Sequence, residues 1–361
     1  MSKRKSEFNK YKKASEAGAF SGIIHMEGAA CRKGSEQVET YESIRLWKDQ
    51  EIQQFRHDSH ALNRFHDEVM LKVLEVAKQQ IELTSPPCRY TWFITGSGGR
   101  LEQGLMSDQD HGIIYETSNE QTDWYFKQLG NELADGLHLA GYPYCQGKIM
   151  SSNPLWRKSI DEWKQQLHLW LKDGGWDSIR QLQIFFDARP LYGEEVFIHE
   201  LKSFFFTYIE DHPQLLERFM RNIEHIKHGI GLMGQILVER YGIYEGCVDL
   251  KYAAFLPYVN AIRLLSIKEG LFETPTLVRI AELKKVKCYA ELLQHSEENF
   301  RSLLSYRLTL ANAAHYTDTH YLDIQTLSKQ ERKVLKRILK DGKQLHEHIL
   351  AHIKKGVEYG I

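Results

Sequence analysis

Apolar residues recur with a helical period in the first part of the chain. Between about residues 39 and 83 they return every third or fourth position, as at Val69, Val73 and Val76, with charged residues between them. Ser85-Pro86-Pro87 ends this pattern, because proline lacks an N–H and restricts the backbone of the residue before it. We therefore expect a helical N-terminal region over residues 36–85.

The pattern changes in the next hundred residues, where short apolar runs alternate with helical spacing. Runs rich in aromatic and β-branched residues at 90–95, 111–115 and 182–187 predict strands. Helical spacing at about 122–140 and 160–171, each ended by glycine, lies between the second and third runs. Strands alternating with helices predict a small α/β unit over residues 86–200.

Helical spacing returns for the remainder of the chain and predicts a C-terminal helical bundle over residues 201–361. Asp249 is placed to begin an apolar helix through Leu265, with a kink at Pro257. Ser328 and Glu331 form a capping-box pattern ahead of a long amphipathic stretch. The fold class expected for the whole is α+β, of α/β type: a small domain with a mixed β-sheet, flanked by helical regions.

Composition and charge exclude several classes of protein. The 361 residues are 42% hydrophobic, and 47 basic side chains nearly balance 48 acidic ones, so the chain has no global attraction to nucleic acid or to an anionic membrane. No run of apolar residues is long enough for a membrane-spanning helix. The five cysteines are scattered, which favours reduced thiols in the cytoplasm. Residues 1–35, basic at their start, predict a flexible arm.

The candidate chemistry lies directly after the predicted strand at 90–95. Gly96-Ser97-Gly98-Gly99-Arg100 offers a side-chain-free backbone that can approach phosphate oxygens, a hydroxyl and a permanent positive charge. Asp108 and Asp110 follow at the entry to the next strand. Their two-residue spacing places both carboxylates on one side of an extended chain, where a divalent cation would relieve their repulsion.

A third carboxylate stands at the end of the predicted strand at 182–187. Asp187 follows three apolar residues, so we expect it at a buried edge, where an acid rarely occurs without a partner. On a neighbouring strand it would complete a metal site with Asp108 and Asp110. Either motif alone is common; their joint order along the chain is what indicates a site.

This combination resembles the signature of the DNA polymerase beta-like nucleotidyltransferase superfamily. The stretch GSGGRLEQGLMSDQDHGIIY is similar, more narrowly, to the putative nucleotidyltransferases allied to the uridylyltransferase of the PII protein. Further segments of the resemblance are 142–150, 153–157, 184–189 and 249–251, with Arg263 and 274–279. The similarity runs from about residue 60 to residue 290.

The resemblance implies transfer of a nucleoside monophosphate from a nucleoside triphosphate to a hydroxyl of a protein or small-molecule acceptor, in signalling or regulation. It implies two Mg²⁺ (or Mn²⁺) ions, one held by Asp108, Asp110 and Asp187 and one by Asp108 and Asp110, with Asp187 also a candidate general base. The nucleotide-binding residues expected from these segments are the following: Gly96, Ser97, Gly98, Gly99, Arg100, Lys148 and Arg157. ATP is a candidate donor, and a homodimer through the helical bundle is a further expectation. Membrane and nucleic-acid partners are not expected.

The chain departs from the family pattern at three positions. An acidic residue usually stands at Gly98, a glycine at Leu101 and an asparagine at His111. None of these is one of the three carboxylates. The departures leave an alternative open, a catalytically weak nucleotide-binding regulatory module that acts through its helical domain.

Overall fold

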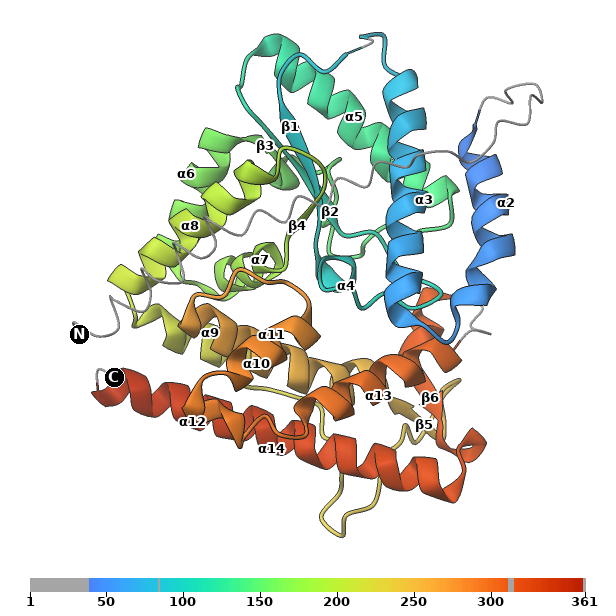
Figure 1. The fold of residues 1–361 in the computed structure, drawn as a ribbon, viewed down its shortest axis with the longest axis vertical. Helices are drawn as coiled ribbons and strands as arrows, with labels where there is room; N and C mark the ends of the chain where they lie inside the picture. The colour runs from blue at the N-terminus through green and yellow to red at the C-terminus, as the bar shows by residue number, and fades with distance from the viewer. Residues whose placement is uncertain (1–38, 84, 311–314, 360–361) are drawn as a thin grey trace. The chain divides into compact units, whose positions relative to one another are not determined.

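Four strands form a mixed sheet in the order β3-β2-β1-β4 (Figure 1). The computed structural model describes residues 39–83, 85–310 and 315–359. In the sheet, β1 (Tyr90–Ile94) pairs antiparallel with β2 (His111–Tyr115) and with β4 (Arg189–Gly193), whereas β2 pairs parallel with β3 (Arg157–Ser159). A mixed sheet flanked by helices confirms the expected α+β fold class.

The alternation of residues along the central strands assigns each face of the sheet to its own core. Trp92 and Ile94 of β1 lie in one hydrophobic cluster, and Phe93 between them lies in the other. In β2, Ile113 faces the first cluster and Ile114 the second. Both faces are thus buried under helices, which explains why these two strands are buried throughout, are rich in apolar residues and were predicted from the sequence.

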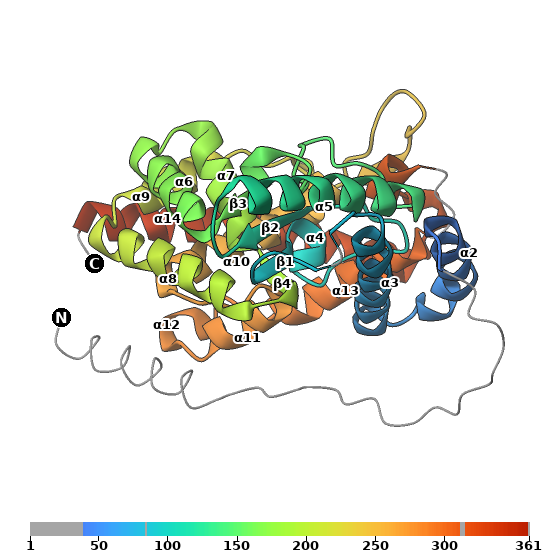
Figure 2. The ribbon, with the colours of Figure 1, turned by 90° about the horizontal axis from the view of Figure 1, so that it is seen from above.

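The first face is covered by helices of the N-terminal region and by the helix that follows β2. These are α2 (Tyr41–Glu51), the short η1 (Ile52–Phe55), α3 (Ser59–Gln79) and α5 (Glu120–Leu139). Asp58 ends the turn before α3 and accepts hydrogen bonds from the backbone N–H groups of His60 and Ala61, so the region predicted as helical is two helices with a capped break between them. In Figure 2, α5 lies across the strands and α14 passes behind them.

Three helices cover the second face: α6 (Ile160–Asp173), α7 (Trp176–Phe186) and α8 (Glu195–Asp211). The strand predicted at 182–187 is wrong, because that segment is the end of α7. Ile179, Leu182 and Phe186 are buried at a helical spacing, and the run of aromatic residues that suggested a strand is the inner face of the last turn. The fourth strand is instead β4, which follows immediately.

In this sheet, the two strands that the sequence did not predict lie at the edges. The residues of β3 (Arg157–Ser159) and β4 (Arg189–Gly193) are largely polar or half-exposed. Pro190 is tolerated in β4 because an edge strand leaves one row of backbone groups unpaired. Short polar edge strands have no apolar alternation by which a sequence could reveal them.

The C-terminal part is mainly helical and packs on the same hydrophobic cluster as α6 and α7. Its helices are α9 (Leu215–Ile223), α10 (Leu256–Glu269), α11 (Thr276–Lys284), α12 (Lys287–Ala290), α13 (Ser296–Thr309) and α14 (Lys329–Tyr359). Short 3-10 turns are η4 (Tyr316–His320) and η5 (Ile324–Thr326) in this part and η2 (Pro154–Trp156) before β3. The capping box predicted before α14 is confirmed: Ser328 and Glu331 each accept from the other's backbone N–H.

The helix predicted to begin at Asp249 is confirmed: Oδ1 of Asp249 accepts a hydrogen bond from the backbone N–H of Tyr252 at 3.0 Å, and helical residues follow from Leu250. Residues Cys247–Asp249 form β5, which pairs antiparallel with β6 (Tyr321–Asp323). A π-helical turn, η3 (Lys251–Phe255), leads into α10, and Pro257 lies in the first turn of that helix. The helical stretch thus changes from a π-helical turn to α-helix just before Pro257, and the kink predicted at this proline stays a prediction.

The described residues from Glu39 onward belong to one compact unit. The arm predicted over residues 1–35 lies outside the described residues. Among the helices that the structure describes, none is long and apolar enough to cross a membrane.

Candidate active site

The glycine run after β1 forms one tight helical turn, α4 (Gly96–Gly99), which closes over the entry to β2. Gly96 has a φ of +58°, and a Cβ there would lie 2.1 Å from an oxygen of the Asp110 side chain. A Cβ on Gly99 would lie 2.1 Å from the carbonyl oxygen of Asp187. These two positions require glycine because the backbone of the turn runs against both predicted carboxylate segments.

Asp108 and Asp110 are brought together with a third side chain that the sequence did not indicate. One ligand atom from each of Asp108, Asp110 and Cys145 lies within 4.8 Å of the others. Burial and the neighbouring Asp108 carboxylate raise the pKa of Asp110 to about 7, against the opposing effects of Cys145, Arg100 and Lys251. Two carboxylates and a thiol at this separation fit a divalent cation. Cys145 lies in the loop after α5, so no local spacing could have linked it to this pair.

Asp108 and Asp110 line a cleft of about 190 Å³ whose opposite wall comes from the C-terminal part of the chain. Gly96, Ser97 and Arg100 line it on one side, and Lys251 and Arg307 on the other. Burial lowers the pKa of Lys251, while Asp108 and Asp110 oppose that change. The cleft thus carries a carboxylate pair and a set of cations, as a metal-bound polyphosphate would require.

Two nitrogen atoms on the cleft wall are buried and have no hydrogen-bond partner among the described residues. They are Nε of Arg307 and Nε2 of His320. Burial and the charges of Lys251 and Arg307 lower the pKa of His320 to about 3, so its ring is neutral at pH 7. A buried nitrogen without a partner is costly, and a ligand with oxygen acceptors would satisfy it.

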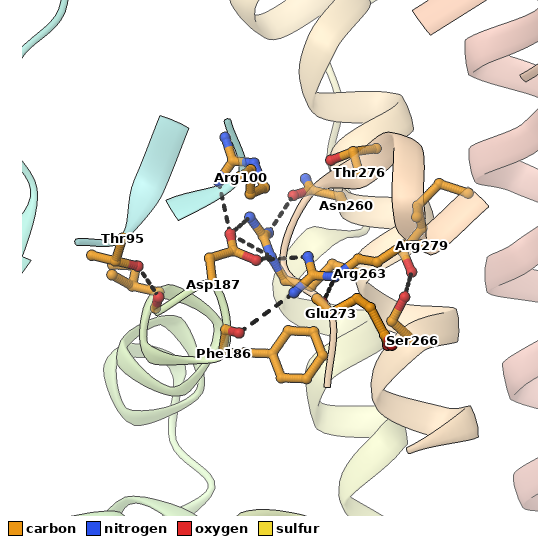
Figure 3. Close-up of polar contacts among 12 residues, drawn as sticks. Thr95, Arg100, Phe186, Asp187, Asn260, Arg263, Ser266, Glu273, Thr276 and Arg279 are labelled. Atoms are coloured by element: carbon orange, nitrogen blue, oxygen red, sulfur yellow. Dashed lines mark hydrogen bonds and ion pairs between the residues drawn. The ribbon is translucent and has the colours of Figure 1, made fainter. Parts of the chain in front are cut away.

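Asp187 lies among arginines at the end of α7 (Figure 3). Arg100 donates to its Oδ2 at 2.7 Å, Arg263 of α10 donates to the same oxygen at 2.5 Å, and Arg279 of α11 donates to Oδ1 at 2.7 Å. Burial alone would raise the pKa of Asp187, but the three guanidinium groups hold it well below its ordinary value. We call these four residues the Asp187 cluster.

The Asp187 cluster extends to one more carboxylate. Glu102 accepts from Arg100 at 2.8 Å and from the hydroxyl of Thr276 in α11. The predicted role of Asp187 as a metal ligand and general base stays a prediction. The contacts found here give this carboxylate another task, which is to orient Arg100 at the floor of the cleft.

Arg189 fixes the glycine turn from the other side. Its Nε donates to the carbonyl of Gly98 at 3.0 Å, and its outer nitrogen donates to Asp67 of α3 at 2.6 Å. Arg189 lies in a segment of the family resemblance, but only the fold shows that it joins α3 to the turn.

Two predicted nucleotide-binding residues lie away from the cleft walls described above. Lys148 is exposed, with a φ of +56°, in the loop before β3. Arg157 in β3 donates to the carbonyl oxygens of Ser151 and Ser152 at 2.6 and 3.0 Å. Arg157 therefore supports the loop that precedes β3. Contact of either residue with a nucleotide stays a prediction.

Leu101, where the family pattern has glycine, has a φ of +56°. This left-handed conformation costs a non-glycine residue about 1–2 kcal/mol, which explains the usual glycine. His111, where asparagine is usual, is buried; Trp92 donates to its Nδ1 at 3.1 Å, and its Nε2 lies 2.9 Å from Oε1 of Gln109. Gly98 has room for a side chain, since the nearest atom to an added Cβ is 3.5 Å away. All three departures are therefore compatible with the turn.

Comparison with known families gives two matches. Residues 49–176 match the family model described as "Putative nucleotidyltransferase DUF294". Residues 213–353 match the model described as "Putative nucleotidyltransferase substrate binding domain". No curated protein matches the chain. The two matched ranges supply the two walls of the cleft.

Proposed function

Because the chain belongs to the nucleotidyltransferase family DUF294, we propose that it transfers a nucleoside monophosphate from a nucleoside triphosphate to a hydroxyl, in a Mg²⁺-dependent reaction. The observation that carries this proposal is the carboxylate pair Asp108 and Asp110, held beside Cys145 under a turn of glycines. A protein or small-molecule acceptor and a role in signalling or regulation are part of the proposal.

The cleft residues would bind different parts of a metal-bound triphosphate according to their charge. The N–H groups of the turn and the Ser97 hydroxyl would donate to phosphate oxygens, and Arg100, Lys251 and Arg307 would neutralise the triphosphate from both walls. Asp108 and Asp110 would hold Mg²⁺ or Mn²⁺ through oxygen, and Cys145 adds a softer ligand that favours Mn²⁺ over Mg²⁺. When bound, the cation would polarise the α-phosphate and stabilise the leaving pyrophosphate.

In this proposal, Asp187 acts by holding Arg100 in position. Its carboxylate accepts from three guanidinium groups, which leaves Arg100 fixed with its charge toward the cleft. Fixed charges of this kind stabilise the developing charge of a transition state without reorganising.

Calorimetric titration of each ribonucleoside triphosphate, with and without Mg²⁺, tests the site. We expect Mg²⁺-dependent binding of one or more triphosphates, weakened about 10–100-fold in Asp108→Asn because a metal ligand is lost. Asp161→Asn is the control, since Asp161 is exposed in the first turn of α6. Unchanged binding in Asp108→Asn would contradict the proposed metal site.

Measuring pyrophosphate release distinguishes a nucleotidyltransferase from the alternative, a regulatory module that binds nucleotide without turnover. A nucleotidyltransferase releases one pyrophosphate for each nucleotidyl group transferred, whereas a sensing module binds the triphosphate and returns it unchanged. Pyrophosphate release by the wild type, lost in Asp108→Asn, would support the enzyme.

A further inference from the structure

A tyrosine from the C-terminal part of the chain lines the cleft on the wall opposite the glycine turn. This residue is Tyr316, in η4, which lines the cleft together with Asp108 and Asp110. Nζ of Lys251 lies 5.9 Å from the centre of the ring, and the ring of His320 stands edge-on at 5.0 Å. The phenol is thus held in place by contacts on several sides.

Other side chains nearby lack this placement. The hydroxyl of Thr319, also on the cleft wall, donates to the carbonyl oxygen of Tyr316 at 2.6 Å. Tyr252 is half-exposed, and its ring centre lies 5.7 Å from the same Nζ of Lys251. The two tyrosines therefore share their cation, and they differ in that Tyr316 faces Asp108 across the cleft.

We propose that Tyr316 is an acceptor of the transferred nucleotide, so that the chain nucleotidylates its own tyrosine. This inference rests on the proposed function, because it requires a nucleoside triphosphate bound in the same cleft. Beyond that function, the inference specifies the class of acceptor, which is a phenolic hydroxyl, and the residue that carries it.

The step balances with the triphosphate as the co-reactant. The phenolic oxygen of Tyr316 attacks the α-phosphorus, a bond forms between them, and the bond from that phosphorus to the bridging oxygen of the β-phosphate breaks. Pyrophosphate leaves with the bonding electron pair. The phenolic proton is released to solvent as the new bond forms.

A modified Tyr316 would also change the cleft. The bound nucleoside monophosphate would place a phosphodiester and a base beside Lys251 and Arg307, on the wall that the triphosphate uses. We therefore expect the modified chain to bind a second triphosphate more weakly than the unmodified chain does. Self-modification would in this way limit the enzyme's own turnover.

The test is incubation of the full chain with Mg²⁺ and each ribonucleoside triphosphate labelled at the α-phosphate, followed by mass spectrometry of the intact protein and its peptides. We expect one nucleotidyl group per chain, on the peptide that contains Tyr316. The label should be lost in Tyr316→Phe and in Asp110→Asn and retained in Tyr252→Phe. Label retained in Tyr316→Phe would overturn the inference.

Two further outcomes separate this inference from the proposed function. If calorimetry shows Mg²⁺-dependent triphosphate binding but Tyr316 stays unlabelled, the self-acceptor is wrong and the nucleotidyltransferase proposal stands. If no triphosphate binds, both proposals fail. A mixture of Asp110→Asn with Tyr316→Phe should give no label, because the triphosphate site and the acceptor tyrosine belong to one chain. Label in that mixture would contradict transfer within a single chain.

Discussion

At the scale of single residues, the site depends on how closely the glycine turn approaches the carboxylates. Gly96 is the sharpest case, because its backbone is left-handed and its α-carbon faces the Asp110 side chain. Gly98, two residues later in the same turn, has ordinary van der Waals room. The two glycines form a matched pair for testing whether the turn sets the position of Asp110.

Gly96→Ala should weaken Mg²⁺-dependent triphosphate binding by about tenfold or more, equivalent to about 1.4 kcal/mol. The added Cβ would lie 2.1 Å from Oδ2 of Asp110 and would displace that carboxylate. Gly98→Ala should leave the affinity within about twofold, because its Cβ would contact nothing closer than 3.5 Å. Calorimetry measures both, with circular dichroism to check the fold; equal effects of the two substitutions would contradict this prediction.

The sequence revealed the site residues that are close to one another along the chain, and it did not reveal those that are far apart along the chain. Asp108 and Asp110 are two residues apart and follow a glycine run, so chain geometry alone places them together. Lys251 and Tyr316 reach the same cleft from other elements, and Cys145 reaches the carboxylate pair from the loop after α5. No periodicity relates residues so far apart, and only the packing of the C-terminal helices on the catalytic part brings them there.

At the scale of elements, apolar composition alone did not separate a strand from a helix. The segment ending at Phe186 is rich in aromatic residues, yet its buried positions repeat every three to four residues as the inner side of α7. The central strands β1 and β2 were predictable because both their faces are buried. The edge strands β3 and β4 were not, because a half-exposed edge needs few apolar residues.

At a contact between α10 and α14, replacing a helical glycine by alanine should lower stability, although this substitution ordinarily raises it. Gly342 lies inside α14, where alanine would ordinarily stabilise a helix by about 1 kcal/mol relative to glycine. Here an added Cβ would lie 2.6 Å from Cε2 of Tyr258, which is buried in α10. Gly342→Ala should therefore destabilise the protein by about 1–3 kcal/mol, the usual cost of overpacking.

Urea denaturation measures this change. A double variant that also carries Tyr258→Leu should lose less stability than the two single substitutions summed, because the smaller side chain makes room for the Cβ. A rise in stability for Gly342→Ala alone would show that the two helices can separate at no cost.

At the scale of the whole molecule, the ion pairs of the Asp187 cluster connect the catalytic part to the C-terminal helices. Arg100 and Asp187 come from the first, and Arg263 and Arg279 from the second (Figure 3). Asp187 and Arg279 are fully buried. Three guanidinium groups against one central carboxylate leave excess positive charge if that carboxylate is removed.

Asp187→Asn should lower the free energy of unfolding by about 3–5 kcal/mol, because the arginines would then be buried without their shared partner. The control is Glu217→Gln, which removes an exposed ion pair with Arg221 and should cost less than about 1 kcal/mol. Thermal and urea denaturation measure both. If Asp187→Asn abolished metal binding and left stability unchanged, Asp187 would be the metal ligand of the original prediction.

The general architecture could be predicted from the sequence, because helix and strand periods differ and proline, glycine and capping residues mark the ends of elements. The small sheet formed by β5 and β6 could not, since Val248 and Leu322 lie in short strands that resemble helix ends. The Asp187 cluster could not either, because the charges in it are spread over four separate elements.

The Asp187 cluster also has a consequence for synthesis on the ribosome. Arg279 follows Asp187 by 92 residues, so the carboxylate emerges long before its most buried partner. At a translation rate of about 5–20 residues per second, that interval is roughly 5–20 s. When Asp187 is made, Arg100 is the one guanidinium partner of the three already synthesised, because Arg263 and Arg279 follow it in the chain. The complete set of contacts to Asp187 must therefore wait for α10 and α11, and we expect a chain interrupted before α11 to hold this carboxylate less firmly.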